Sequence, residues 1–111
     1  MASKLEKDYQ ASLLRRLRKA YRSRILATKT DPGSVQGIPD LIVICDSKYA
    51  LLEVKRSATA SKRPNQDYYI EKFGQYSFTS FIYPENEHEV IWYMLEFFGL
   101  DPNLYFQVGG K

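Results

Sequence analysis

The chain has 111 residues, of which 26% are charged, 44% hydrophobic and 14% aromatic, and its formal net charge is +3. This length suits one domain, and the aromatic content argues against intrinsic disorder. No run approaches the roughly 18 apolar residues of a membrane span, and early charges such as Lys4 do not fit a secretory signal. With one cysteine and one histidine, neither an internal disulfide nor a Cys/His zinc site is expected. These features predict a small, soluble, intracellular globular domain.

Positive charge is concentrated near the N-terminus. The first 30 residues hold nine Lys or Arg against two acidic residues, whereas the rest of the chain has an acidic excess. A polyanion such as nucleic acid would be attracted to this end. A solvated helix face explains the same run of charge without any ligand.

A first helix is predicted from Ser3 to about Ser23, opened by a capping box of Ser3 and Glu6. At 100° per residue its apolar side chains form one stripe. Glu6 projects from the middle of that stripe, where an unpaired carboxylate is costly to bury. Either Glu6 reaches water at the helix end, or the fold needs a carboxylate there. The apolar stripe consists of Tyr9, Leu13, Leu14, Leu17, Ala20 and Tyr21.

The remaining pattern alternates strands and helices. Strands are predicted at 24–30, 41–45, 49–55 and 78–83, with a hairpin turn at 46–48. A mobile loop at 57–63 precedes a short helix that starts at Pro64 or Asn65 and stops at Gly74. After an acidic loop at 85–89, residues 90–98 are a buried helix or a strand, and Gly99 and Pro102 favour the helix. The order predicts a mixed α/β sheet flanked by helices.

Residues 103–107 resemble most of a viral-protease recognition site used in expression tags, and no prediction rests on them.

The most informative residues are Asp40, Glu53 and Lys55. If the turn places Cys45 opposite Ala50, Asp40 lies opposite Lys55, and all three side chains share one face at one end of the hairpin. A register shifted by one residue would separate Asp40 from the other two.

Two adjacent carboxylates repel each other, and one would ordinarily take up a proton. A divalent cation removes this conflict, and Mg²⁺ prefers such oxygen ligands together with water and substrate phosphate. The ion can polarise a phosphodiester and activate water, and a lysine stabilises the developing negative charge. The alternative is that Glu53 and Lys55 are solvent-facing neighbours on a strand and Asp40 only begins one.

These motifs resemble the PD-(D/E)XK nuclease superfamily. Pro39-Asp40 followed by Glu53-Val54-Lys55 is similar to its signature. The fuller runs 37–43 and 51–56, Gly-Ile-Pro-Asp-Leu-Ile-Val and Leu-Leu-Glu-Val-Lys-Arg, look like the small VRR-type nucleases of phages and DNA-repair enzymes. The resemblance implies an αβββαβ core over about residues 3–83 of a single domain, with a C-terminal helix and tail at 87–111 that could form an interface.

Carried over by position, the resemblance makes Asp40 and Glu53 the metal-binding carboxylates, with the main-chain carbonyl of Val54 as a further ligand. Lys55 becomes the catalytic lysine. Glu6 matches a glutamate that relatives contribute from the first helix. Gln66 fits a glutamine on the helix after the Glu-x-Lys strand, although position 70 is Ile where the stricter pattern has Tyr, and an ordinary amide is the alternative.

The implied function is Mg²⁺-dependent endonuclease activity on DNA, with Mn²⁺ as a substitute, in a homodimer in the cytoplasm of a bacterial host if the chain is of phage origin. Structure-selective cutting of branched or junction DNA is expected over strong sequence specificity. The alternatives are a non-catalytic nucleic-acid-binding module and a site-specific homing or restriction-type nuclease. Basic residues expected to contact phosphates are Lys29, Arg56, Lys62, Arg63, Arg15, Arg18 and Arg22.

Overall fold

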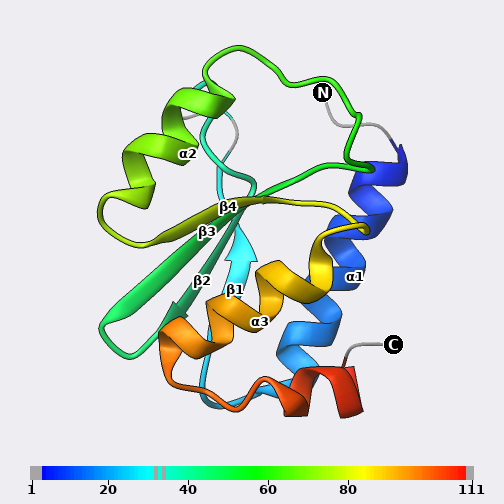
Figure 1. Ribbon diagram of the computed structural model, residues 1–111, viewed down its shortest axis with the longest axis vertical. Coiled ribbons are helices and arrows are strands. Elements are labelled where there is room, and N and C mark those ends of the chain that lie inside the picture. The colour runs from blue at the N-terminus through cyan, green and yellow to red at the C-terminus, as the bar shows by residue number, and fades with distance from the viewer. Residues whose placement is uncertain (1–3, 32, 34, 110–111) are drawn as a thin grey trace.

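The computed structural model describes residues 4–31, 33 and 35–109, so the predicted capping residue Ser3 lies outside the described residues. The predicted order of elements is confirmed as a mixed α/β sheet flanked by helices (Figure 1). The elements are α1 (Lys4–Ala20), β1 (Leu26–Lys29), β2 (Leu41–Cys45), β3 (Lys48–Val54), α2 (Gln66–Gly74), β4 (Phe78–Ile82), α3 (Glu87–Phe98) and the π-helical turn η1 (Tyr105–Gly109).

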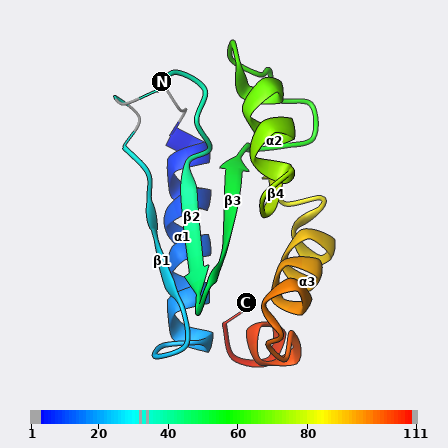
Figure 2. The same cartoon turned by 90° about the vertical axis from the view of Figure 1, so that its left-hand side faces the viewer.

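The four strands lie side by side in the order β1-β2-β3-β4 (Figure 2). β1, β2 and β3 pair antiparallel, whereas β4 runs parallel to β3. A parallel pair needs a long crossover connection, and α2 with its flanking loops supplies it. β3 therefore occupies an interior position, and its residues 50–54 are all buried.

The hairpin register differs from the predicted one. Cys45 pairs with Lys48, and Val43, in place of Cys45, pairs with Ala50. The turn contains only two residues because Asp46 adopts a left-handed conformation with φ of 55°. The shift is two residues, and side chains alternate with a period of two. Each side chain therefore stays on its predicted face, and the face shared by positions 40 and 53 is retained.

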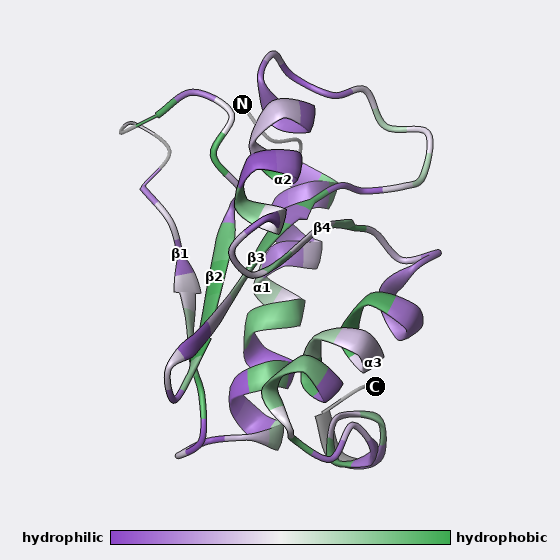
Figure 3. Cartoon of the chain, turned by 60° about the vertical axis from the view of Figure 1, so that its left-hand side comes forward, coloured by the Kyte–Doolittle hydropathy of each residue, from purple (hydrophilic) through white to green (hydrophobic). Residues whose placement is uncertain are grey.

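The core lies on one face of the sheet, between the strands and the helices α1 and α3. Leu13 and Leu17 of α1 meet Leu41 and Leu52 of the sheet, and all four are fully buried. β2 is hydrophobic along its length (Figure 3), as its apolar, β-branched sequence predicts. α2 reaches the opposite face at the end of β3, where Gln66 contacts Glu53.

α3 begins earlier than predicted. The prediction of an acidic loop at 85–89 is wrong for residues 87–89, because the helix already begins at Glu87. Glu87 and Glu89 lie in the first turn, where the helix dipole favours negative charge. The helix expected at 90–98 is confirmed, and Ile91 and Met94 are fully buried in the core. In the described part of the chain, no helix is long and apolar enough to cross a membrane.

A partly buried polar cluster ties α1, α3 and η1 together around Glu87. Its carboxylate accepts hydrogen bonds from the hydroxyls of Tyr9 (2.7 Å) and Tyr105 (2.9 Å) and pairs with the guanidinium of Arg16. Burial alone would raise the pKa of Glu87, but these donors outweigh it and lower the pKa below its usual value. Tyr105 is fully buried, so the stretch 103–107 contributes to the core.

Glu87→Ala is expected to lower the free energy of unfolding at pH 7 by about 2–3 kcal/mol, because Arg16 would keep a buried charge without its partner. Tyr105→Phe removes one hydrogen bond and should cost about 1 kcal/mol. Urea denaturation measures both, with Glu89→Ala in the same helical turn as the exposed control. Since the pKa of Glu87 is lowered, its contribution is present at neutral pH and lost in acid. An equal loss in Glu89→Ala would contradict this role for Glu87.

Candidate active site

Asp40, Glu53 and Lys55 meet at one end of the sheet, on the face that α2 partly covers. The carboxylate of Asp40 accepts a hydrogen bond from the main-chain N–H of Val54 at 3.0 Å. This contact joins the loop before β2 to the end of β3. Glu53 and Lys55 are 1% and 4% exposed, so the alternative of two solvent-facing neighbours on a strand does not describe them. The predicted clustering of the three side chains is what the structure shows.

Burial and mutual repulsion shift the pKa values of the two carboxyl groups. Burial first, and then the negative charge of Asp40, raise the pKa of Glu53 to about 8, although the ammonium of Lys55 acts in the opposite direction. Burial also raises the pKa of Asp40, and the N–H of Val54 offsets part of that rise. A protein without a cation here would therefore keep a proton on the pair at neutral pH.

The two carboxylate oxygens of Glu53 differ in their surroundings. Oε2 accepts a hydrogen bond from the side-chain amide of Gln66 at 2.6 Å, and it lies 3.9 Å from Lys55 Nζ and 3.7 Å from Arg63 Nη2. Oε1 is buried, and no N–H or hydroxyl group of the described residues donates a hydrogen bond to it, so only a proton shared with Asp40 could satisfy it in the absence of a cation. An unpartnered buried carboxylate oxygen is costly, and a hard divalent cation would satisfy it. The residues present therefore fit a metal ion of the Mg²⁺ type.

Gln66 holds Glu53 in place and is itself fixed by the preceding loop. It is 1% exposed, and its side-chain carbonyl accepts the main-chain N–H of Arg63 at 2.8 Å. Its amide thus has a defined orientation toward Glu53. Gly37 lets the loop before Asp40 approach the start of α2: its φ is +91°, and a Cβ there would lie 2.8 Å from that of Asn65.

The ammonium of Lys55 is oriented by the loop that leaves β3. Lys55 Nζ donates to the main-chain carbonyl of Ser61 at 3.1 Å. The sequence gives no sign of this contact, because a main-chain acceptor can be any residue. The loop at 56–65 is largely hydrophilic (Figure 3), yet through Ser61 it takes part in the site.

Glu6 reaches the same end of the molecule from α1. It is 8% exposed, and its carboxylate accepts the main-chain N–H of Arg56, next to Lys55, at 3.3 Å. Of the two explanations for its place on the apolar stripe, access to water at the helix end does not hold. Within the described ranges, no three Asp, Glu, His or Cys side chains form a metal-ligand group. The role of Glu6 as a metal ligand stays a prediction.

The predicted phosphate contacts divide into two groups. Arg56 and Arg63 are both exposed. Arg63 lies beside Glu53 and lines an open pocket of about 350 Å³ with Asp40 and Gln66, whereas Arg56 contacts Glu6 through its main-chain N–H. Lys62 is held by other groups, since its ammonium lies 3.1 Å from a carboxylate oxygen of Asp67 and 4.4 Å from the ring centre of Phe81. The structure brings the second group together elsewhere, in a groove between α1 and β1: Arg15, Arg18, Arg22 and Lys29.

Glu53→Gln is expected to stabilise the protein in EDTA at pH 8 while leaving it equally stable at pH 4. The folded-state pKa of Glu53 is raised to about 8, so wild type loses stability as the pH rises from the unfolded value toward 8. Glutamine has no such titration and still offers Gln66 an acceptor oxygen. The gain should be about 1–3 kcal/mol at pH 8.

Urea denaturation from pH 4 to pH 8 measures this difference, with the exposed Glu71→Gln on α2 as the matched control. A Glu53→Gln variant that is less stable than wild type at pH 8 in EDTA would refute the assigned electrostatics.

The fold is similar to that of a solved structure, whereas comparisons of the sequence with family models and curated proteins gave no match. A solved structure described as a "VRR_NUC domain protein" superposes with a TM-score of 0.65 over 92% of this chain and 97% of that chain, at 16% sequence identity. At this identity the likeness concerns the fold alone. The chain therefore has a mixed α/β fold like that of a VRR_NUC domain protein.

Proposed function

We propose that this protein is a divalent-metal-dependent DNA endonuclease. The observation that carries the proposal is the carboxyl pair of the buried Glu53 and the half-buried Asp40. The pKa of Glu53 is raised to about 8, and no N–H or hydroxyl group of the described residues donates a hydrogen bond to its Oε1. A bound divalent cation relieves the repulsion and satisfies that oxygen. The resemblance in fold to a VRR_NUC domain protein supports a nuclease.

The side chains have distinct roles in this proposal. Asp40, Glu53 and the main-chain carbonyl of Val54 hold Mg²⁺, which Mn²⁺ can replace. When bound, the ion polarises the phosphodiester and lowers the pKa of water beside it. Gln66 keeps the Glu53 carboxylate oriented through its 2.6 Å hydrogen bond. Lys55 places a positive charge where negative charge develops on the phosphoryl oxygens.

Glu6 is proposed as an additional ligand, direct or through water, because its carboxylate already lies beside the main chain that follows Lys55. Arg56 and Arg63 are proposed to contact the phosphates that flank the scissile bond. Such contacts give salt-dependent affinity without choosing a base sequence. We therefore propose selection by DNA structure, such as a branch or junction, over selection by sequence.

The wild-type protein with Mg²⁺ is expected to cut at least one member of a panel of linear, nicked, flapped and four-way DNA. Lys55→Ala should lower the cleavage rate by about 10²-fold or more, and its DNA affinity in EDTA should change little. Lys72→Ala, an exposed lysine of α2 outside the site, is the matched control. The readout is the single-turnover rate on end-labelled DNA, with and without EDTA.

Cleavage that survives both EDTA and Lys55→Ala would contradict a metal-dependent site built on these residues. Tight DNA binding without cleavage of any substrate would instead favour a non-catalytic binding module. A single cut in long genomic DNA, with no preference for branches, would favour a homing or restriction-type nuclease.

We also propose that the protein is a homodimer that buries the open half of the sheet. On the face away from α1, Leu26 is 60% exposed, and Ile44 and Tyr49 lie beside it in the same cross-strand row. The rim of this row carries both signs of charge, in the ion pair of Arg24 and Asp46. A surface with an apolar centre and both charges at its rim is complementary to itself across a twofold axis.

Leu26→Lys combined with Ile44→Lys is expected to convert a dimer into a monomer, because two buried charges would face each other across the axis. Tyr93→Lys, at an exposed position of α3, is the control and should leave the dimer intact. Analytical ultracentrifugation measures the mass. A wild-type protein that is monomeric at high concentration would contradict the proposed interface.

A further inference from the structure

A second basic surface lies in the groove between α1 and β1. The groove has a volume of about 560 Å³, and none of the described residues that line it is acidic. Small apolar residues of α1 form part of its wall, so its chemical character comes from the cations. They project from the second half of α1, from the turn that follows it at Arg22, and from the neighbouring strand β1. The five cations are Arg15, Arg18, Lys19, Arg22 and Lys29.

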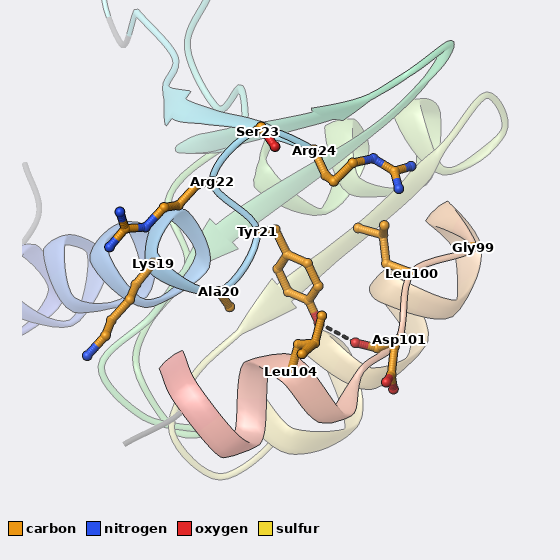
Figure 4. A pocket seen from close by; sticks show the side chains of 10 residues that line it. All are labelled: Lys19, Ala20, Tyr21, Arg22, Ser23, Arg24, Gly99, Leu100, Asp101 and Leu104. Atoms are coloured by element: carbon orange, nitrogen blue, oxygen red, sulfur yellow. Dashed lines mark hydrogen bonds between the residues drawn. The ribbon is translucent and has the colours of Figure 1, made fainter.

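The groove is partly preorganised. The guanidinium of Arg18 donates from Nε to the main-chain carbonyl of Ala27 at 2.9 Å, which ties α1 to β1 and fixes one cation at the junction. Figure 4 shows Lys19 and Arg22 projecting together from the end of α1, whereas Arg24 points away from them. Arg24 is directed toward Asp46, with 3.5 Å between its guanidinium and the carboxylate, so it belongs to another surface.

One end of the groove adjoins the loop that carries Asp40. Lys29 pairs with Leu41, the residue after Asp40, and the N–H of Thr30 donates to the carbonyl of Asp40 at 2.8 Å. The other end lies beyond the last turn of α1, at Arg22. α1 runs from the end of the sheet that carries the carboxylates toward the opposite end of the molecule (Figure 1), so the residues that line the groove lead away from the carboxylates.

The distance from the catalytic end of α1 to the far end of the groove sets how far a bound ligand must extend, and the groove itself begins at Ala11. Glu6 marks the catalytic end of α1, and from there to Ala20 the helix spans about 21 Å at about 1.5 Å per residue. Duplex DNA rises about 3.4 Å per base pair, so this length matches about six base pairs. A row of cations without carboxylates suits a ligand with regularly spaced negative charges, and a small anion would engage only one or two of them.

We propose that the α1–β1 groove binds the phosphate backbone of a duplex arm that extends about six base pairs to one side of the cleavage site. This inference rests on the proposed nuclease function and adds a substrate feature to it. The groove supplies affinity and direction and takes no part in the chemistry. The substrate class is DNA with a duplex arm on at least one side of the scissile phosphate.

The test compares Arg15→Gln/Arg22→Gln with a matched double variant, Lys48→Gln/Lys72→Gln, which loses the same charge at exposed positions away from α1 and the groove. Arg18 stays unchanged because its contact with Ala27 supports the fold. Fluorescence anisotropy in EDTA measures the affinity for junction DNA with arms of 2 to 12 base pairs at several salt concentrations. Poly-glutamate serves as the competing acidic polymer.

For wild type, affinity should rise as the arm lengthens to about six base pairs and then level off. The groove variant should bind about 10-fold more weakly, lose this dependence on arm length, and show a salt slope lower by about 1.8, or about 0.9 for each lost phosphate contact. Its cleavage rate at saturating protein should equal that of wild type, because the carboxylates are untouched.

Equal salt slopes in the groove variant and the control, or unchanged dependence on arm length, would overturn the proposal. Competition by poly-glutamate as effective as by duplex DNA would overturn it in favour of an acidic protein ligand. Because binding is measured in EDTA, the two proposals fail separately. If affinity depends on arm length but no DNA is ever cut, the groove proposal stands and the nuclease proposal fails. If DNA is cut but affinity does not depend on arm length, the nuclease proposal stands and the groove proposal fails.

Discussion

The close approach of the buried carboxyl group of Glu53 and the half-buried carboxyl group of Asp40 is the constraint on which the rest of this structure depends. Asp40 and Glu53 are held together by the hydrogen bond from Val54 and by the amide of Gln66. In the absence of a cation the arrangement is unfavourable, as the raised pKa of Glu53 shows. Strain of this kind persists only where the surrounding structure enforces it. The sheet end, the 56–65 loop and the start of α2 together enforce it here.

Favourable packing in the rest of the fold offsets the free-energy cost of bringing Asp40 and Glu53 together. The core lies on the other face of the sheet, where α1 and α3 bury fully enclosed aliphatic side chains. Glu87 gathers Tyr9, Arg16 and Tyr105 from two other elements into one satisfied polar cluster. A satisfied buried network adds rigidity, whereas a partly satisfied one is costly. Among the described residues, a buried carboxylate oxygen without a hydrogen-bond donor is found in the site, at Glu53, and the other buried atoms without partners are the neutral hydroxyls of Ser77 and Thr79.

Part of the site followed from local patterns. The spacing of Asp40, Glu53 and Lys55 predicted that they lie at one end of a hairpin, on the same face. The predicted register was wrong by two residues, but the shared face was still correct because side chains alternate with a period of two. The odd position of Glu6 on an apolar stripe left two explanations open, exposure at the helix end and a carboxylate needed inside the fold, and the structure decided for burial. The contact of Lys55 with Ser61 could not be foreseen, since a main-chain carbonyl leaves no trace in composition or spacing.

The sequence by itself determined the order of elements, the apolar stripe of the first helix and the face shared by the acidic residues, because these depend on periodicity and turn chemistry over a few positions. Only the tertiary structure decided which groups distant in the chain meet. The pairing of Arg16 with Glu87 and the separation of the basic residues into two surfaces arise from packing across the sheet. Such contacts depend on how helices settle against strands, and no local pattern encodes that geometry.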